Sequence, residues 1–132
     1  MRNITFNVSQ EWFDKYKSGL KDKEYRAITA YWVKRLITME DNTVAHQMSE
    51  ELPTELMRYD SLADTLDYFG CSIKEYDIVT ICLGYPAKDD LERRITFKYL
   101  STSIGYAEAG IGKELMGDDL VFVIQMERTV NF

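Results

Sequence analysis

The chain is poor in the residues that build most metal sites and disulfide frameworks. Its 132 residues include one histidine, His46, and two cysteines, Cys71 and Cys82. A single histidine excludes histidine-based zinc sites, and two cysteines without ligand spacing make no framework. Carboxylate oxygens remain as metal ligands, yet no aspartate-rich calcium loop is present. Gly112-Lys113 is not followed by Ser or Thr, which excludes a nucleotide P-loop. We therefore expect no metal and no cofactor.

Proline and long apolar runs are scarce as well. With two prolines and seven glycines there is no flexible linker, so we expect residues 1–132 to form one domain. No apolar run approaches the roughly 18 residues of a membrane helix. The first residues alternate like a strand, whereas a signal peptide would open with an apolar block. A soluble, cytoplasmic protein with no membrane partner is expected.

Positive charge is in deficit overall but not locally. The net charge of −6 argues against avid, nonspecific binding of nucleic acid. Residues 1–36 nevertheless carry eight Lys or Arg against four acidic residues, while the remainder carries eight against 18. An anionic ligand would be drawn to the N-terminal part, and the acidic remainder would deter promiscuous binding.

The N-terminal part alternates strand and helix patterns. Ile4, Phe6 and Val8 alternate with polar residues, which predicts a half-buried strand. Residues 10–18 have the apolar spacing of a helix that closes at Gly19. A charged strand is expected over about 21–28, and a second helix, capped by Thr29, over 30–37.

The rest of the chain predicts a helical insertion followed by strands. Residues of about 38–75 show helical spacing with a strongly acidic outer face. Residues 78–83, 94–99 and 120–126 read as strands, residues 101–105 either continue the second of these or bend away, and residues 110–117 read as a loop. The pattern predicts an α+β fold: a small, mostly antiparallel β-barrel with flanking helices and a helical insertion.

The most distinctive stretch is residues 19–26, Gly-Leu-Lys-Asp-Lys-Glu-Tyr-Arg. On a strand, Asp22, Glu24 and Arg26 would share one face, and Lys21, Lys23 and Tyr25 the other. Close opposite charges of this kind form either a solvated surface, where each pair contributes about 0–1 kcal/mol, or a binding site.

Several motifs, taken in order, carry a resemblance to a known family. They are Ser18-Gly19-x-Lys21-x-x-Glu24-Tyr25-Arg26, then Tyr31-Trp32, Arg35-Leu36, Tyr76-Asp77-Ile78-Val79, Gly84-Tyr85, Ser103-Ile104-Gly105 and Phe122-Val123-Ile124. This set resembles the ASCH domain, a small relative of the RNA-binding PUA fold, over roughly residues 3–36 and 76–130. The resemblance implies a PUA-like barrel, from which the insertion departs.

The resemblance implies recognition of RNA or a nucleotide in a cleft. Lys21 and Arg26 would hold a phosphate or base edge, Arg through a bidentate fork and Lys as a point charge. Glu24 would accept from a base amino group, and Tyr25 or Tyr85 would offer an aromatic face. Tyr31 and Trp32, beside cations, suit either base stacking or core packing. We expect the barrel end and the helix of residues 30–37 to enclose the site, with Lys21 at its rim and Trp32 or Tyr85 as a wall.

Two alternatives stay open. Some relatives are hydrolases that cut RNA or remove an acyl group from a modified cytidine. The latter use a lysine at the Lys21 position, a threonine nucleophile three residues later and a distant glutamate. Glu24 stands in the threonine's place, so only a Lys21–Glu24 acid/base pair could act here, if burial moved their pKa values toward neutrality. In the other alternative, the acidic residues 40–73 dock on a basic protein partner and the barrel is only a scaffold.

Overall fold

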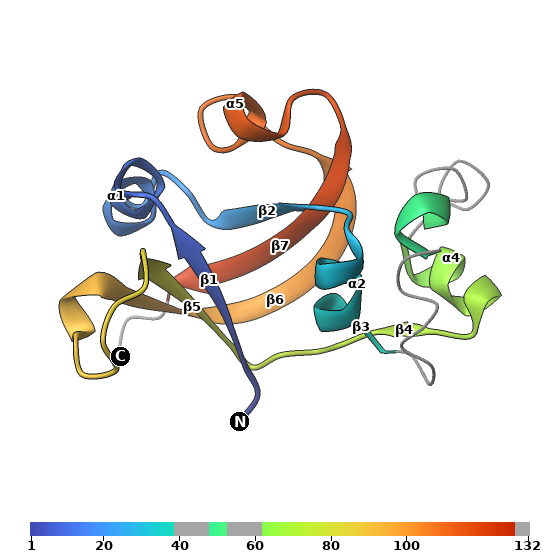
Figure 1. Ribbon diagram of the computed structural model, residues 1–132, viewed down its shortest axis with the longest axis horizontal. Coiled ribbons are helices and arrows are strands. Elements are labelled where there is room, and N and C mark those ends of the chain that lie inside the picture. The colour runs from blue at the N-terminus through green and yellow to red at the C-terminus, as the bar shows by residue number, and fades with distance from the viewer. Residues whose placement is uncertain (39–47, 53–61, 129–132) are drawn as a thin grey trace.

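A curved five-stranded sheet forms the centre of the molecule (Figure 1). The computed structural model describes residues 1–38, 48–52 and 62–128, and structural statements here concern those residues. The strand order is β1-β5-β6-β7-β2. Its strands are β1 (Asn3–Val8), β2 (Lys23–Ala27), β5 (Ile78–Leu83), β6 (Arg94–Tyr106) and β7 (Leu120–Arg128). Only β1 and β5 run parallel within this sheet as described. The predicted mixed α+β class and mostly antiparallel sheet are confirmed.

The sheet curls without closing. β1 and β2 are its two edges, and among the described strands no backbone ladder joins them. The edges approach each other where β1 ends, because the Arg26 guanidinium on β2 donates a 3.1 Å hydrogen bond to the Asn7 carbonyl on β1. We call the gap between the end of β1 and strand β2 the seam. Among the described residues, a side-chain hydrogen bond spans the seam and backbone pairing does not. The barrel expected from the sequence is therefore not closed.

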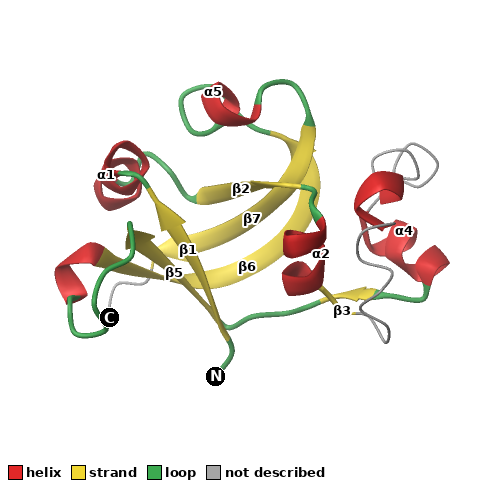
Figure 2. Cartoon of the chain, viewed as in Figure 1, coloured by secondary structure: helices red, strands yellow, loops and turns green. Residues whose placement is uncertain are grey.

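Helices cover both ends of the curled sheet (Figure 2). Helix α1 (Gln10–Ser18) follows β1 and ends at Gly19, which adopts the left-handed conformation with φ of +85°. Helix α2 (Ala30–Leu36) follows β2, and its Thr29 cap accepts a hydrogen bond from the Trp32 backbone N–H. Both helices confirm the sequence prediction. A short helix, α5 (Lys113–Met116), lies within the stretch predicted as a loop.

Strand β6 is longer than its sequence suggests. It runs unbroken from Arg94 to Tyr106 and absorbs an irregularity in register against β7 between Tyr99 and Ser101. Of the two alternatives for residues 101–105, the structure has the first: they continue the strand that begins at Arg94. A register shift of this kind typically bends a strand and increases its local twist, in the direction of the observed curl.

The insertion begins and ends at a two-stranded ladder. Strand β3 (Ile37–Thr38) pairs antiparallel with β4 (Ser72–Ile73), a pairing that the sequence does not suggest. Between them, residues 48–52 are helical and α4 spans Leu62–Phe69, in agreement with the predicted helical spacing. Residues 39–47, which include His46, and 53–61 lie outside the described part of the chain.

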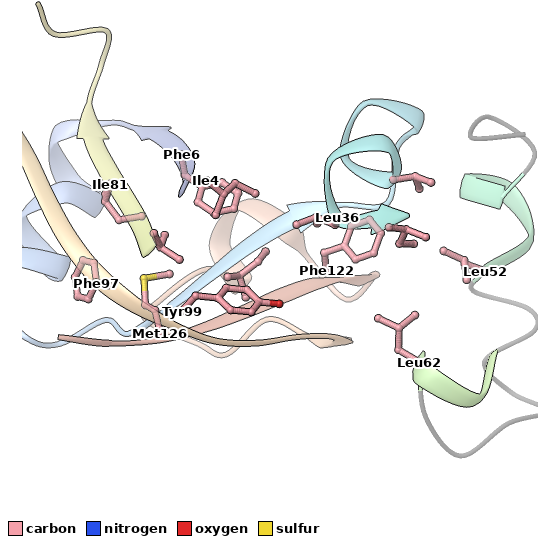
Figure 3. Packing of buried hydrophobic residues seen from close by; sticks show 14 of the residues in the cluster. Ile4, Phe6, Leu36, Leu52, Leu62, Ile81, Phe97, Tyr99, Phe122 and Met126 are labelled. Carbon is pink, nitrogen blue, oxygen red and sulfur yellow. The ribbon is translucent and has the colours of Figure 1, made fainter. Parts of the chain in front are cut away.

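One hydrophobic core joins the insertion to the sheet. Leu52 and Leu62 face Leu36 of α2 and Phe122 of β7 (Figure 3), and all four belong to the same buried cluster. That cluster extends through Ile4, Phe6, Ile81, Phe97, Tyr99 and Met126. A second, smaller cluster packs Val121 and Val123 against Tyr25 and Ala107. The described helices include none that is both long and apolar enough to cross a membrane.

Candidate functional site

A cavity of about 290 Å³ lies in the seam. It takes its walls from four places: the end of β1, helix α1, the β2 strand with the residues before it, and α5 with the glycine that precedes it. The lining residues are Asn7, Val8, Ser9, Trp12, Lys21, Glu24, Tyr25, Arg26, Gly112, Leu115 and Met116. Both sheet edges contribute, so the absence of strand pairing is what leaves room for the cavity.

Three charged residues of the Gly-Leu-Lys-Asp-Lys-Glu-Tyr-Arg stretch meet in this cavity. The Glu24 carboxylate lies between two cations, with Oε1 3.3 Å from Lys21 Nζ and Oε2 2.7 Å from an Arg26 nitrogen. Lys21 is only 4% exposed and Glu24 only 3%. The Arg26 side chain is 22% exposed, so the trio is a largely buried cluster with a net charge of +1 and not a solvated charged surface.

Lys21 joins the cluster because it precedes the strand. β2 begins at Lys23, so the alternation that would turn Lys21 away from Glu24 does not extend to it. The chain bends at Gly19 and returns, with the Lys21 N–H donating to the Lys15 carbonyl at the end of α1. Lys21 therefore points under α1 and not toward solvent.

Glu24 is the hub of the cluster. The Tyr16 hydroxyl of α1 lies 3.0 Å from Glu24 Oε1 and 2.8 Å from the Lys23 carbonyl, so its proton is shared between two acceptors. Burial, and then the nearby Glu24 carboxylate, raise the pKa of Tyr16 well above its ordinary value. Glu24 thus has three donors in place, and a carboxylate can accept about four hydrogen bonds. One acceptor position remains for a ligand.

The Lys21 ammonium sits among aromatic rings. Its Nζ lies 4.6 Å from the Trp12 ring centre, 5.0 Å from that of Tyr16 and 5.8 Å from that of Tyr25. Ring faces attract cations and partly replace lost water. Burial nonetheless lowers the Lys21 pKa from its ordinary value, against the opposing effect of Glu24. The ammonium is held with less solvation than usual, which favours a ligand or a proton acceptor.

Arg26 is flanked by rings. Its guanidinium carbon lies 5.2 Å from the Phe6 ring centre and 5.0 Å from that of Trp32. One guanidinium nitrogen, Nη2, donates hydrogen bonds to both the Glu24 carboxylate and the Asn7 carbonyl. The buried Nε has no hydrogen-bond partner among the described residues. A buried donor without an acceptor is costly, so this atom marks a place where a ligand oxygen or nitrogen would be stabilised.

Helix α5 acts as a lid on the cavity. Gly112 lies so close to Tyr25 that a Cβ there would stand 2.3 Å from the ring. The segment before α5 is fixed by exposed contacts, among them a 2.6 Å ion pair between Lys23 and Glu108 and a hydrogen bond from Lys15 to the Gly110 carbonyl. Because Lys21 and Glu24 are buried, a ligand reaches them only if this segment or its side chains yield.

The structure gathers some of the expected site residues and separates others. Lys21, Glu24, Tyr25 and Arg26 line the cavity together. Trp32 stands behind Arg26 and does not line it, and Tyr85 is 91% exposed on the turn after β5. The expectation that Trp32 or Tyr85 forms a wall is therefore wrong.

The expected enclosure also differs. α1 and α5 cover the cavity, whereas α2 packs its Val33 and Leu36 into the main core. An apolar helix face shows that a helix packs, but not against which surface. Lys21 lies inside the site and not at its rim, because the aromatic rings of α1 cover it.

Sequence reasoning missed Trp12 and Tyr16 as site residues. Both lie on the apolar face predicted for residues 10–18, where aromatic side chains ordinarily indicate core. The available signal was their polar atoms: a buried Tyr hydroxyl usually finds a partner, and Glu24 lies only eight residues beyond Tyr16. Leu115 and Met116 gave no signal, because residues 110–117 were read as a loop.

A larger groove elsewhere is a weaker candidate. It measures about 1030 Å³ and is lined by Thr5, Thr80 and Thr96 in one row across β1, β5 and β6, together with Lys17, Lys88, Glu92, Arg94 and Arg128. Lys17, Lys88, Glu92 and Arg128 are exposed and so remain largely solvated. Arg94 is the exception: its Nε is buried without a hydrogen-bond partner among the described residues, but its Nη2 donates to the Pro86 and Ala87 carbonyls. The smaller seam cavity is the better site because its charged groups are desolvated.

Metals and relatives give no further guidance. Within residues 1–38, 48–52 and 62–128, no cluster of three or more His, Cys, Asp or Glu side chains is arranged to hold a metal ion. Comparison with protein-family models, with curated proteins and with solved structures returned no match. The functional conclusion therefore depends on the geometry of the seam.

Proposed function

We propose that this protein recognises RNA or a nucleotide, with one nucleotide unit bound in the seam cavity. The observation that carries the proposal is the buried Lys21–Glu24–Arg26 cluster, which lines a cavity walled by Trp12 and Tyr25. Desolvated ionic clusters are expensive and are kept chiefly where they bind or react, although structural ion pairs also occur. The resemblance of these residues to the ASCH motif, and an open PUA-like sheet, belong to the same proposal.

The cavity matches such a ligand in charge, size and chemistry. Its net charge of +1 favours an anionic or electron-rich group, and its volume of about 290 Å³ is at the lower end of the range of small-molecule pockets, roughly 300–1,000 Å³. Arg26 Nε offers a donor and Glu24 a remaining acceptor position, a pair that suits the mixed edge of a base. The Tyr25 and Trp12 rings offer stacking surfaces.

Titration of mononucleotides and short RNA and DNA oligonucleotides tests the proposal. Trp12 borders the cavity, so its fluorescence should change on binding; a Trp32→Phe background isolates that signal. We expect Lys21→Met to weaken binding at least about tenfold. Lys23→Met is the matched control, because Lys23 lies two residues away and pairs with exposed Glu108. With two cations at the site, binding to single strands should fall with salt with a slope of about −1 to −2.

Two results would refute the assignment. One is binding that is unaffected by Lys21→Met in a variant that remains folded by circular dichroism. The other is binding that Lys23→Met weakens as much as Lys21→Met does, since this would indicate general attraction to the basic N-terminal part.

A second candidate function, hydrolysis, is favoured by one specific observation. Burial lowers the pKa of Lys21, and its Nζ is 3.3 Å from Glu24, so the pair is arranged for proton transfer. Incubation of the wild type and Lys21→Met with labelled RNA and with acylated cytidine tests this. Turnover that survives the substitution would exclude the seam as its site.

A further inference from the structure

A patch of cationic and aromatic side chains surrounds the C-terminal end of α2. We call it the α2 patch and define it as Arg2, Tyr31, Lys34, Arg35, Lys74 and Tyr76. Its cations lie over its rings: the Arg35 guanidinium is 3.4 Å from the Tyr31 ring centre, and that of Arg2 is 5.3 Å from the Tyr76 ring centre. In a chain of net charge −6, four cations beside two tyrosines are a local exception.

The patch is held in shape by hydrogen bonds to the end of the helix. Lys74 Nζ donates to the Lys34 carbonyl at 2.7 Å, and the Tyr76 hydroxyl donates to the Arg35 carbonyl. Arg35 itself donates to the Tyr31 carbonyl at 3.1 Å. The side chains therefore do not need to be ordered when a ligand arrives, which reduces the entropic cost of binding.

A continuous series of ring and cation contacts connects the patch to the seam cavity. Tyr31 packs edge-on against Trp32 with ring centres 4.9 Å apart, and Trp32 packs on Arg26 at 5.0 Å. Arg26 is itself a wall of the cavity. The series Arg35–Tyr31–Trp32–Arg26 thus runs from an exposed surface, where Tyr31 is 55% exposed, to the buried site.

We propose that the α2 patch binds unpaired nucleotides adjacent to the one in the seam, so that the protein's ligand is a single-stranded nucleic acid and not a free nucleotide. The proposal rests on the proposed function of the seam. Unpaired bases stack on aromatic rings and on guanidinium planes, and their phosphates seek Lys and Arg. Tyr31 and Arg35 supply the planes, and Lys34 and Lys74 supply the charges.

Helix stabilisation alone accounts for less of the arrangement. Contacts between residues four apart and cations at a helix C-terminus stabilise helices, which explains Arg35 on Tyr31 and Lys34 near the last turn. Neither effect calls for an exposed tyrosine in contact with Trp32, nor for Lys74, which approaches from a different segment. Glu75 and Asp77 are the acidic neighbours in sequence, and they leave the patch with a positive balance.

The experiment compares ligand lengths and backbones. Fluorescence-detected titrations would use a mononucleotide, a pentanucleotide in ribo and deoxyribo forms, and an abasic oligomer carrying the same number of phosphates. We expect either pentanucleotide to bind about five- to a hundredfold more tightly than the mononucleotide, and the abasic oligomer to lose most of that gain. The ribo and deoxyribo forms distinguish RNA from DNA.

Two double variants separate the patch from general surface charge. Tyr31→Ala with Arg35→Ala should abolish the gain with length and leave mononucleotide binding unchanged. Tyr85→Ala with Lys88→Ala, which removes an exposed tyrosine and an exposed cation on the turn after β5, should have no effect. All these side chains are exposed, so both double variants should fold.

The outcomes distinguish the two proposals. Equal affinity for the mononucleotide and pentanucleotide would overturn the patch and leave the seam standing. A gain that persists in the Tyr31/Arg35 variant, or that the abasic oligomer reproduces, would also overturn it. Pentanucleotide binding that is lost in this variant but insensitive to Lys21→Met would support the patch and refute the seam.

Discussion

Glu24 connects the charged and polar side chains of the site. It is 3% exposed and accepts from Tyr16, Lys21 and Arg26. Loss of its charge would leave a buried ammonium on Lys21 and a partly buried guanidinium on Arg26, both beside aromatic rings. Removing one partner of a buried ion pair is strongly destabilising because the remaining charge is uncompensated.

We therefore expect Glu24→Gln to lower the free energy of unfolding by about 3–5 kcal/mol. Glu108→Gln is the matched control: it removes the same charge from an exposed pair, whose glutamate side chain is 57% exposed, and should cost no more than about 1 kcal/mol. Urea denaturation measures both. Equal effects for the two substitutions would show that the buried cluster is not specially dependent on Glu24.

At the scale of elements, the contact between α5 and β2 controls the cavity. Gly112 caps α5 and faces the Tyr25 ring, and no side chain fits between them. The position of α5 is therefore set directly against the Tyr25 ring, with no intervening side chain.

Gly112→Ala should separate the lid from β2. The added methyl group would stand 2.3 Å from Tyr25, so either the ring rotates or α5 shifts, at a cost of about 1–3 kcal/mol. In the control Gly105→Ala, the nearest atom is Val123 Cγ2 at 3.7 Å, an ordinary contact, and stability should stay the same or rise slightly. Urea denaturation together with Trp12 fluorescence checks the result. A Gly112→Ala protein as stable as the wild type would show that α5 is not tightly seated.

Only some of the helices and strands could be predicted from the sequence. Alternation and helical spacing predict β1, α1 and α2, because each buries one periodic face, whereas β5 and β7 are predicted from short, β-rich apolar runs. The two-residue strands β3 and β4 are too short for any period to show. The motif resemblance predicts Tyr85 as an aromatic face of the site, yet Tyr85 follows Gly84, a turn residue with φ of +61°, and is 91% exposed.

Part of the candidate site could be predicted from the sequence. Glu24 and Arg26 lie two residues apart on one strand, so local geometry alone brings them together. Trp12 and Tyr16 reach the same point because the chain turns back after α1, and Gly112 reaches it through packing between segments far apart in sequence; the strand and helix periods encode neither. The motif resemblance selects Lys21, Glu24 and Arg26 as candidate site residues. The burial of Lys21 and Glu24 and the aromatic rings around the cluster are seen only in the structure.

For the whole molecule, alkaline pH is the condition that tests the buried groups together. Burial raises the pKa of several acids that stay protonated in the folded state but ionise on unfolding: Tyr16, Tyr25, Tyr76, Tyr99 and Cys82. Above their ordinary pKa values, from about pH 9 upward, the unfolded chain binds fewer protons than the folded chain, so stability falls as pH rises. Lys21 acts in the opposite sense, because its pKa is lowered in the fold.

Two substitutions should change this pH dependence in opposite directions. Tyr16→Phe removes one raised group, so the decline above pH 10 should be shallower by up to about 1.4 kcal/mol per pH unit. Lys21→Met removes the opposing contribution, so the decline just below pH 10.5 should be steeper. Urea unfolding at intervals between pH 8 and 11 checks both slopes. Identical slopes in the three proteins would contradict the assigned burial effects.

The insertion belongs to the same cooperative unit as the sheet. Leu52, Leu62 and Leu66 share one core with β7 and α2, so the insertion is not an independent module attached to a scaffold. A partner bound by residues 40–73, the third expectation from the sequence, would consequently act on a surface whose buried side supports the main core.

The open seam gives the sheet a property that a closed barrel lacks. In a closed barrel the curvature is fixed by continuous backbone pairing, whereas here the margins β1 and β2 are connected through the Arg26–Asn7 hydrogen bond and the lid. Any ligand in the cavity touches both margins at once. It would therefore connect β1 and β2, the two edge strands, which do not pair with each other. The curvature of the sheet would then change with the fraction of the protein that has ligand bound.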